Sequence, residues 1–150
     1  MRDVGHHVSS VDRWLDGVGA GLSSAALVSL FDDAIARLTT RIRATLGEVT
    51  LTAIVGRVLR NASDKYPNLS VLEADPSGQV KFSGLTDNCR DIDPADLRHA
   101  LRFVMIELLT VIGNLTAEIL TEDLHSELGK VKAPKRSRRK SKKAGESYEV

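Results

Sequence analysis

The sequence predicts an α+β protein that is mostly helical, with an antiparallel helical hairpin, one β-hairpin, a long C-terminal helix and a disordered basic tail. Apolar residues recur at helical spacing over 23–46, 48–61 and 97–128. A turn signal at 75–78 stands between two short segments of strand composition. Nine Lys or Arg residues and no acid fall within 130–143. A chain of 150 residues has room for one domain.

Residues 1–22 are predicted to form a flexible N-terminal segment with a short helix. Ser9 or Ser10 can cap this helix. Three glycines then interrupt it, and they favour a hinge over a phosphate-binding loop because no strand precedes them and no Lys-Ser or Lys-Thr pair follows. The apolar positions of the short helix are Val11, Trp14, Leu15 and Val18. The globular domain is therefore expected at 23–129, and the tail at 130–150.

The helical hairpin is predicted from two amphipathic segments on either side of Gly47. The first begins at Ser23 or Ser24, and the second runs from about Glu48 to Asn61. Apolar residues of the first segment are Leu27, Leu30, Phe31, Ala34, Ile35, Leu38, Ile42 and Leu46, and those of the second are Leu51, Ile54, Val55, Val58, Leu59 and Ala62.

The β-hairpin is predicted at 69–82. Pro67 disfavours helical backbone at the residue before it, and residues 69–74 have strand composition. Asp75-Pro76-Ser77-Gly78 has the residue types of a tight turn, and the second strand covers 79–82. Residues 83–92 are expected to form a loop.

The long helix starts at Asp93-Pro94, which supplies a capping carboxylate and an N1 proline. It is expected to reach Leu128, with a kink or split at Gly113-Asn114 and a stop at Gly129. Its apolar surface exceeds what one hairpin of helices can cover, so a homodimer through this helix is predicted. The predicted dimer seam is Leu97, Leu101, Val104, Leu108, Val111 and Leu115.

A membrane span is the rival interpretation of this helix. Arg102, Glu107, Asn114 and Glu118 interrupt the apolar run and argue against it. The first ten residues lack the apolar core of a signal peptide. A cytoplasmic protein is therefore expected.

No catalytic residue, metal site, cofactor or small-molecule substrate is predicted. His99-Ala100-Leu101-Arg102 resembles the core of phosphotransfer helices, but Phe103 stands where that family has a small glycine, so a surface histidine is favoured. Cys89, the one cysteine, is expected to be a small buried or loop group. The aspartates at 87, 91, 93 and 96 lack calcium-loop spacing, and His125 with Glu118 and Glu122 is interpreted as a solvated helix face.

The basic tail is the main functional signal. Residues 1–129 carry 12 − 18 = −6 charges, and 130–143 carry 9 − 0 = +9. The run has no aromatic residue, so nucleic-acid binding by the tail would be electrostatic and independent of base sequence. An acidic protein or an anionic membrane surface would attract it by the same physics. Predicted polyanion-binding residues are Lys130, Lys132, Lys135, Arg136, Arg138, Arg139, Lys140, Lys142 and Lys143, and Ser137 and Ser141 are candidate modification sites.

The stretch Lys65-Tyr66-Pro67-Asn68-Leu69, the hairpin after it, Asp93-Pro94 and the long helix to Leu128 together resemble small accessory modules of prokaryotic signalling proteins, including histidine kinases and signalling ATPases. The resemblance covers residues 24–128 in outline and implies a sensing or protein-interaction role. The expected function is therefore a non-enzymatic signalling or scaffold module that is dimeric through its long helix. The alternative is a nucleic-acid-binding protein that contacts phosphates through its tail.

Overall fold

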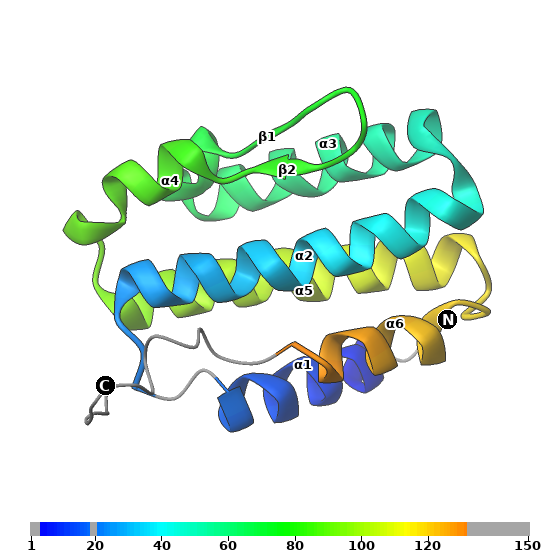
Figure 1. The fold of residues 1–150 in the computed structure, drawn as a ribbon, viewed down its shortest axis with the longest axis horizontal. Helices are drawn as coiled ribbons and strands as arrows, with labels where there is room; N and C mark the ends of the chain where they lie inside the picture. Colours follow the sequence, from blue (N-terminus) through cyan, green and yellow to red (C-terminus); the bar gives the residue numbers. More distant parts are fainter. Residues whose placement is uncertain (1–3, 19–20, 132–150) are drawn as a thin grey trace, which may run out of the picture.

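A computed structural model describes residues 4–18 and 21–131 of the chain. Within these residues the fold is mostly helical with one small antiparallel sheet, which confirms the predicted class (Figure 1). The elements are α1 (Val4–Val18), α2 (Ser24–Leu46), α3 (Glu48–Lys65), the 3-10 helix η1 (Pro67–Val71), β1 (Glu73–Ala74), β2 (Val80–Lys81), α4 (Ser83–Asn88), the 3-10 helix η2 (Cys89–Asp91), α5 (Pro94–Leu115) and α6 (Thr121–Gly129).

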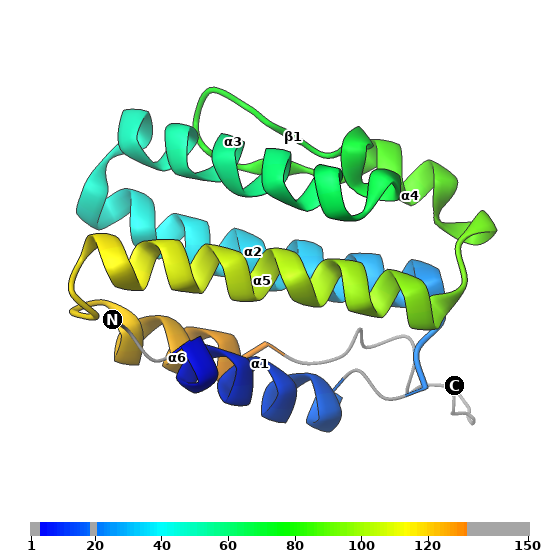
Figure 2. The same ribbon diagram turned by 180° about the vertical axis from the view of Figure 1, so that it is seen from behind.

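The helices form three layers. α2 and α5 lie alongside each other in the middle, α3 with the β-hairpin and α4 covers one side, and α1 with α6 covers the other (Figures 1 and 2). A single cluster of apolar side chains from all three layers fills the interior. α5 is therefore enclosed within one chain, by α3 on one side and by α1 and α6 on the other.

The helical hairpin is confirmed. The Ser23 hydroxyl accepts a hydrogen bond from the Ala26 amide at 3.2 Å, which caps α2. Gly47 ends α2 with φ of 89°, a conformation that favours glycine, and its amide donates to the Arg43 carbonyl. α3 extends to Lys65, beyond the predicted end at Asn61, and stops just before Pro67.

The β-hairpin is confirmed in place but is shorter than predicted. The Asp75 carboxylate accepts hydrogen bonds from the amides of Ser77 at 2.9 Å and Gln79 at 3.1 Å, which fixes the turn. The first strand was predicted from Leu69, but 67–71 form η1, in which Pro67 starts the 3-10 turn and Leu69 is buried. Tertiary packing of Leu69 thus outweighs the strand propensity of this segment.

Residues 83–91 are helical, contrary to the predicted loop. α4 and η2 follow directly after the hairpin and bury Leu85 and Cys89, which lie four residues apart. These two residues share one helical face over the core. The segment is too short for its periodicity to stand out in the sequence.

The predicted long helix is two helices. α5 starts at Pro94 after the Asp93 cap, as expected, and ends at Leu115. Ala117 and Glu118 then adopt φ of 53° and 65°, and the Glu118 amide donates to the Gly113 carbonyl at 2.7 Å. This left-handed turn reverses the chain, so α6 packs back against α2 and α1.

α1 belongs to the same core as residues 23–129, although a flexible N-terminal segment was predicted there. Val11 and Leu15 are fully buried, and Trp14 is 7% exposed. Asp12 forms a two-pronged ion pair with Arg102 of α5, with N···O distances of 2.6 and 3.1 Å. No helix in the described part of the chain is both long and apolar enough to cross a membrane.

Candidate functional site: a polar chain between α1 and α6

A chain of polar side chains joins α1, α6 and the turn before α6. The Ser10 hydroxyl lies 2.9 Å from Nδ1 of His125. Nε2 of His125 lies 3.1 Å from Nδ1 of His7. Nε2 of His7 in turn lies 3.3 Å from Oε1 of Glu118, within ion-pair distance, and the Thr121 hydroxyl donates a hydrogen bond to the same oxygen. The chain thus runs from a partly exposed hydroxyl on α1 to a carboxylate in the turn.

The helices and the turn before α6 position each side chain of this polar chain. His7 and Ser10 stand three residues apart on one face of α1, and His7 is only 1% exposed. His125 projects from α6, and its ring meets that of His7 edge to face at 5.2 Å between centroids. Glu118 is brought over Gly113 by the left-handed turn, where a Cβ on Gly113 would lie 2.7 Å from the carboxylate oxygens. Gly113 therefore leaves the space that the carboxylate occupies.

This site is not predicted from the sequence, because its members come from three segments. His125, Glu118 and Glu122 were interpreted as one solvated face, but the reversal after α5 separates Glu118 from α6 and directs it to His7. No pattern in the sequence signals the pairing of His7 with His125, which are 118 residues apart.

A hydroxyl, an imidazole and an orienting group are also the parts of a nucleophilic site. Ser10 lies inside α1, so the helix already uses the nearby backbone N–H groups. Acyl transfer needs such donors at the developing oxyanion. The arrangement therefore joins the two helices by polar contacts, and within the described α1 the backbone at Ser10 has its N–H groups in the helix.

The predicted dimer seam lies largely inside the chain. Leu97, Leu101, Val104 and Leu108 are all buried in the core that α5 shares with its neighbours. Val111 is partly buried, and Leu115 is 58% exposed. The apolar surface that suggested a homodimer is thus covered by α1, α2, α3 and α6, and the homodimer stays a prediction.

Of the predicted polyanion-binding residues, Lys130 lies in the described part of the chain. It is exposed, and its ammonium pairs with Glu127 at 3.2 Å. Outside the described residues lie Lys132, Lys135, Arg136, Arg138, Arg139, Lys140, Lys142 and Lys143, together with Ser137 and Ser141.

The structure places the other candidate residues of the sequence at the surface, in the core or at the start of a helix. His99 is exposed on α5 beside a cleft of about 390 Å³ that Tyr66 and Asn68 also line. Cys89 is buried and donates to the Thr86 carbonyl at 3.4 Å. Asp93 caps α5. Across residues 4–18 and 21–131, no group of three or more His, Cys, Asp or Glu side chains is arranged to hold a metal ion.

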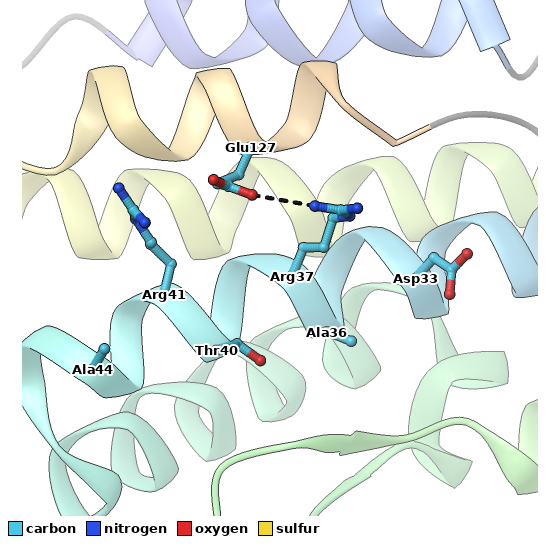
Figure 3. A pocket seen from close by; sticks show the side chains of 7 residues that line it. All are labelled: Asp33, Ala36, Arg37, Thr40, Arg41, Ala44 and Glu127. Carbon is cyan, nitrogen blue, oxygen red and sulfur yellow. Dashed lines mark hydrogen bonds and ion pairs between the residues drawn. The ribbon is translucent and has the colours of Figure 1, made fainter.

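A groove of about 550 Å³ runs between α2 and α6 (Figure 3). Arg37 reaches across it to Glu127 at 3.4 Å, and Arg41 pairs with Asp123 at 3.3 Å. The hydrogen bond from Lys130 and the charges of Arg41 and Arg37 hold the pKa of Glu127 below its ordinary value. The cations of the groove are therefore matched by carboxylates of the same chain.

Exposed apolar side chains gather at one end of the bundle. Among the described residues, the large hydrophobic side chains that are exposed are Val49 at 86%, Leu115 at 58% and Ile119 at 79%. Val49 stands at the start of α3, and Leu115 and Ile119 flank the turn between α5 and α6. The α2–α3 and α5–α6 connections lie next to each other at this end in both views (Figures 1 and 2).

Comparison of the chain with protein-family models, with curated proteins and with solved structures gave no significant match.

Proposed function

We propose that this protein is a non-enzymatic signalling or scaffold module of the cytoplasm, which binds a protein partner through the end of the bundle formed by Val49, Leu115 and Ile119. The observation that carries this proposal is the grouping of these exposed side chains on two adjacent turns. Among the described residues these three are the large hydrophobic side chains that are exposed, and exposed apolar groups that gather in one place mark interaction sites.

Charge defines the partner further. Glu48 precedes Val49 and Glu122 follows Ile119 by three residues, and both are exposed. Residues 1–129 carry a net −6. An apolar patch with acidic neighbours fits a partner surface that combines apolar and basic side chains. The basic residues of 130–143 would give the same module a second contact, with an anionic partner.

The test compares four versions of the protein as bait: wild type, Leu115→Ser with Ile119→Ser, Ala25→Ser with Ala95→Ser, and a chain ending at Val131. Ala25 and Ala95 are exposed near the starts of α2 and α5, at the other end of the bundle from the proposed site, and serve as the matched control. We expect partners that survive tail removal and the control substitutions but are lost with Leu115→Ser and Ile119→Ser. Identical retention by all folded versions would refute the proposed surface.

The homodimer belongs to this proposal as a second use of the same end. Leu115 is the seam residue that is well exposed, and Ile119 and Val49 would extend its contact. Sedimentation over a wide concentration range is the measurement, with Leu115→Ser and Ile119→Ser as the dissociating variant. A mass of one chain at every concentration would exclude the dimer.

Nucleic-acid binding is the second candidate, favoured by the nine basic residues in 130–143. Binding would depend steeply on salt, since each phosphate contact releases counterions. Removing residues 132–150, which leaves Val131 in its contact with Trp14, should abolish binding to duplex DNA and to RNA, and unchanged binding by the shortened chain would exclude the tail as the binding element.

A further inference from the structure

We propose that the cleft between the end of α3 and the start of α5 holds an arginine side chain from the basic tail of the same chain, from within residues 136–139. The cleft has a volume of about 390 Å³ and lies at the opposite end of the bundle from Val49, Leu115 and Ile119 (Figures 1 and 2). The contact therefore does not depend on the proposed partner surface. It gives a binding site in the folded part to a segment that lies outside the described residues.

The cleft combines an apolar floor, an aromatic wall and a carboxylate. Leu97 and Ala100 of α5 are buried and form the floor. Tyr66, which is partly buried, lines one wall, and the exposed Asp96 lies in the first turn of α5. Arginine side chains bury their aliphatic stems on such a floor, while the charged head stacks on an aromatic ring or reaches a carboxylate. Asn68 adds an amide oxygen that can accept a further hydrogen bond.

The chain beside the cleft is strongly acidic. Residues 87–96 contain four aspartates and one arginine, a balance of 1 − 4 = −3. Asp91 and Asp96 are exposed, and neither forms an ion pair with another described residue. Asp91 lines a second cleft, of about 320 Å³, that shares Asn68 and Ile92 with the first. The carboxylates around the two clefts favour a basic occupant.

The cation that already lines the cleft has an aromatic contact of its own. The ammonium of Lys65 lies over the ring of Phe103, 5.1 Å from the centroid. Phe103 in turn packs against Tyr66, with ring centroids 5.8 Å apart. Lys65 thus contacts the ring of this pair that is outside the cleft lining, and Tyr66 is the ring inside it. A guanidinium can therefore stack on Tyr66 and pair with Asp96 without breaking an ion pair between described residues.

The tail starts within reach of the cleft. The turn after α5 reverses the chain, so α6 runs back toward the start of α5, and the Trp14 indole holds the Val131 carbonyl at 3.0 Å. Two residues further along α1, Asp16 pairs with Arg98 of α5 at 3.1 Å, which places Val131 near the first turns of α5. An extended chain spans about 3.3 Å per residue, so residues 136–139 reach up to about 17–26 Å from Val131. This length allows the contact within one chain.

Arginine fits this lining better than lysine. A planar guanidinium stacks on an aromatic ring and donates to two acceptors at once, whereas the lysine ammonium is a strongly hydrated point charge. The arginines of the tail are Arg136, Arg138 and Arg139. Docking within one chain also profits from a high effective concentration, so a few modest contacts are sufficient.

The contact would regulate the tail. An arginine held in the cleft is withdrawn from an anionic partner, so a polyanion has to displace it before the whole tail is engaged. This consequence rests on the proposed affinity of the tail for anions, whereas the contact with the cleft does not.

The first test compares amide NMR spectra of the full chain and of a chain ending at Val131. Removing residues 132–150 should shift the signals of Asn68, Asp96 and His99, which line the cleft, and should leave that of Arg41 in the α2–α6 groove unchanged. Unchanged signals at the cleft would refute the contact.

Two triple variants of the full chain separate the arginine side chain from charge alone. Arg136→Gln, Arg138→Gln and Arg139→Gln together should give the cleft signals of the shortened chain. Lys140→Gln, Lys142→Gln and Lys143→Gln remove the same charge and should keep most of the tail-dependent shift. Equal effects of the two variants would overturn the arginine site.

The third test measures affinity with a synthetic peptide of residues 132–144 added to the chain ending at Val131. Asp96→Asn should weaken binding about three- to tenfold, because one charged contact is lost. Asp33→Asn, at an exposed aspartate of the α2–α6 groove, is the matched control and should leave the affinity unchanged. Equal weakening by both variants, or a peptide that shifts no cleft signal, would refute the site.

Mixing separates the tail of the same chain from that of a second copy. Isotope-labelled chain ending at Val131 should keep its own cleft signals when unlabelled full chain is added at about 0.05 mM, since each tail is held by its own cleft. Shifts at the labelled cleft would assign the contact to a second copy and overturn the intrachain form.

Duplex DNA added to the full chain should return the cleft signals to those of the chain ending at Val131. Cleft signals that do not respond to bound DNA would overturn the regulatory consequence. A DNA that does not bind at all would instead refute the nucleic-acid function, while the spectra without DNA decide the contact between tail and cleft.

Discussion

The indole of Trp14 donates a hydrogen bond to the carbonyl of Val131 at 3.0 Å, across 117 residues of sequence. Both residues are buried, and the Trp14 ring also packs edge to face on Phe31, with centroids 5.4 Å apart. The N-terminal helix therefore holds the chain at the start of the basic tail. This contact therefore stabilises the packing of α1 against the residues that follow α6.

Trp14→Phe should lower the free energy of unfolding by about 1–2 kcal/mol, because it keeps an aromatic ring but leaves the buried Val131 carbonyl without its donor. Chemical denaturation followed by circular dichroism measures the change. Arg13→Ala, at the neighbouring position on the surface, should stay within about 0.5 kcal/mol of wild type. Equal effects of the two substitutions would contradict the role of the hydrogen bond.

Asp12 and Arg102 should show a coupling free energy of about 0.5–1 kcal/mol in a double-mutant cycle with Asp12→Asn and Arg102→Gln, since the pair is two-pronged but partly exposed. The hydrogen bond from Arg102 holds the pKa of Asp12 below its ordinary value. A carboxyl whose pKa is lower in the folded state stabilises the fold above its unfolded pKa, about 3.9, and loses this contribution as the pH falls through the folded value.

The stability difference between wild type and Asp12→Asn should therefore be full at pH 7 and shrink below about pH 4. Thermal unfolding at a series of pH values provides the measurement. A stability difference that grows as the pH falls would contradict the stabilising role of the ion pair between Asp12 and Arg102.

Two glycines should respond to alanine in opposite directions. Gly78 has φ of 92°, and a Cβ there would lie 2.6 Å from two carbons of the buried Leu51, so Gly78→Ala should destabilise the protein by about 2 kcal/mol. Gly56 lies within α3, and the position that its Cβ would take is open space, so Gly56→Ala should stabilise the protein by about 0.5–1 kcal/mol. Denaturation midpoints of both variants, measured side by side, test whether the β-hairpin turn packs on Leu51 of α3.

Gly113→Ala should displace the carboxylate of Glu118 from His7, because the new methyl group would lie 2.7 Å from its oxygens. The side-chain NMR signals of His7 and Thr121, which both contact this carboxylate, should therefore shift. Gly56→Ala, where the position of the Cβ is open space, should leave these signals unchanged. Unchanged signals in Gly113→Ala would mean that Glu118 keeps its place beside the methyl group.

Local signals in the sequence predicted much of the fold. Ser23 and Asp93 as caps, Gly47 as a stop and Asp75 in the turn each act through hydrogen bonds or backbone conformations within a few residues. Their effect does not depend on the rest of the molecule, so the pattern alone was sufficient. The helical periodicity of α2, α3 and α5 was readable for the same reason.

Nonlocal packing decided the features that were missed. The apolar face of α5 resembled a dimer seam because its intramolecular partners, α1 and α6, come from opposite ends of the chain. The reversal occurs at Ala117 and Glu118, and neither residue is a glycine or proline that would predict a turn there. The contact between His7 and His125 depends on that reversal, because only a returning α6 meets α1.

The sequence by itself determined the helical class, the capped boundaries, the tight turn and the charge contrast between the folded part and its tail, since each follows from neighbouring residues or from composition. Tertiary structure alone decided that α1 joins the core, that the long apolar helix is enclosed within one chain, and that two distant histidines meet. The physical reason is that burial and buried hydrogen bonds are properties of contacts, and contacts between distant segments exist only after the chain has closed on itself.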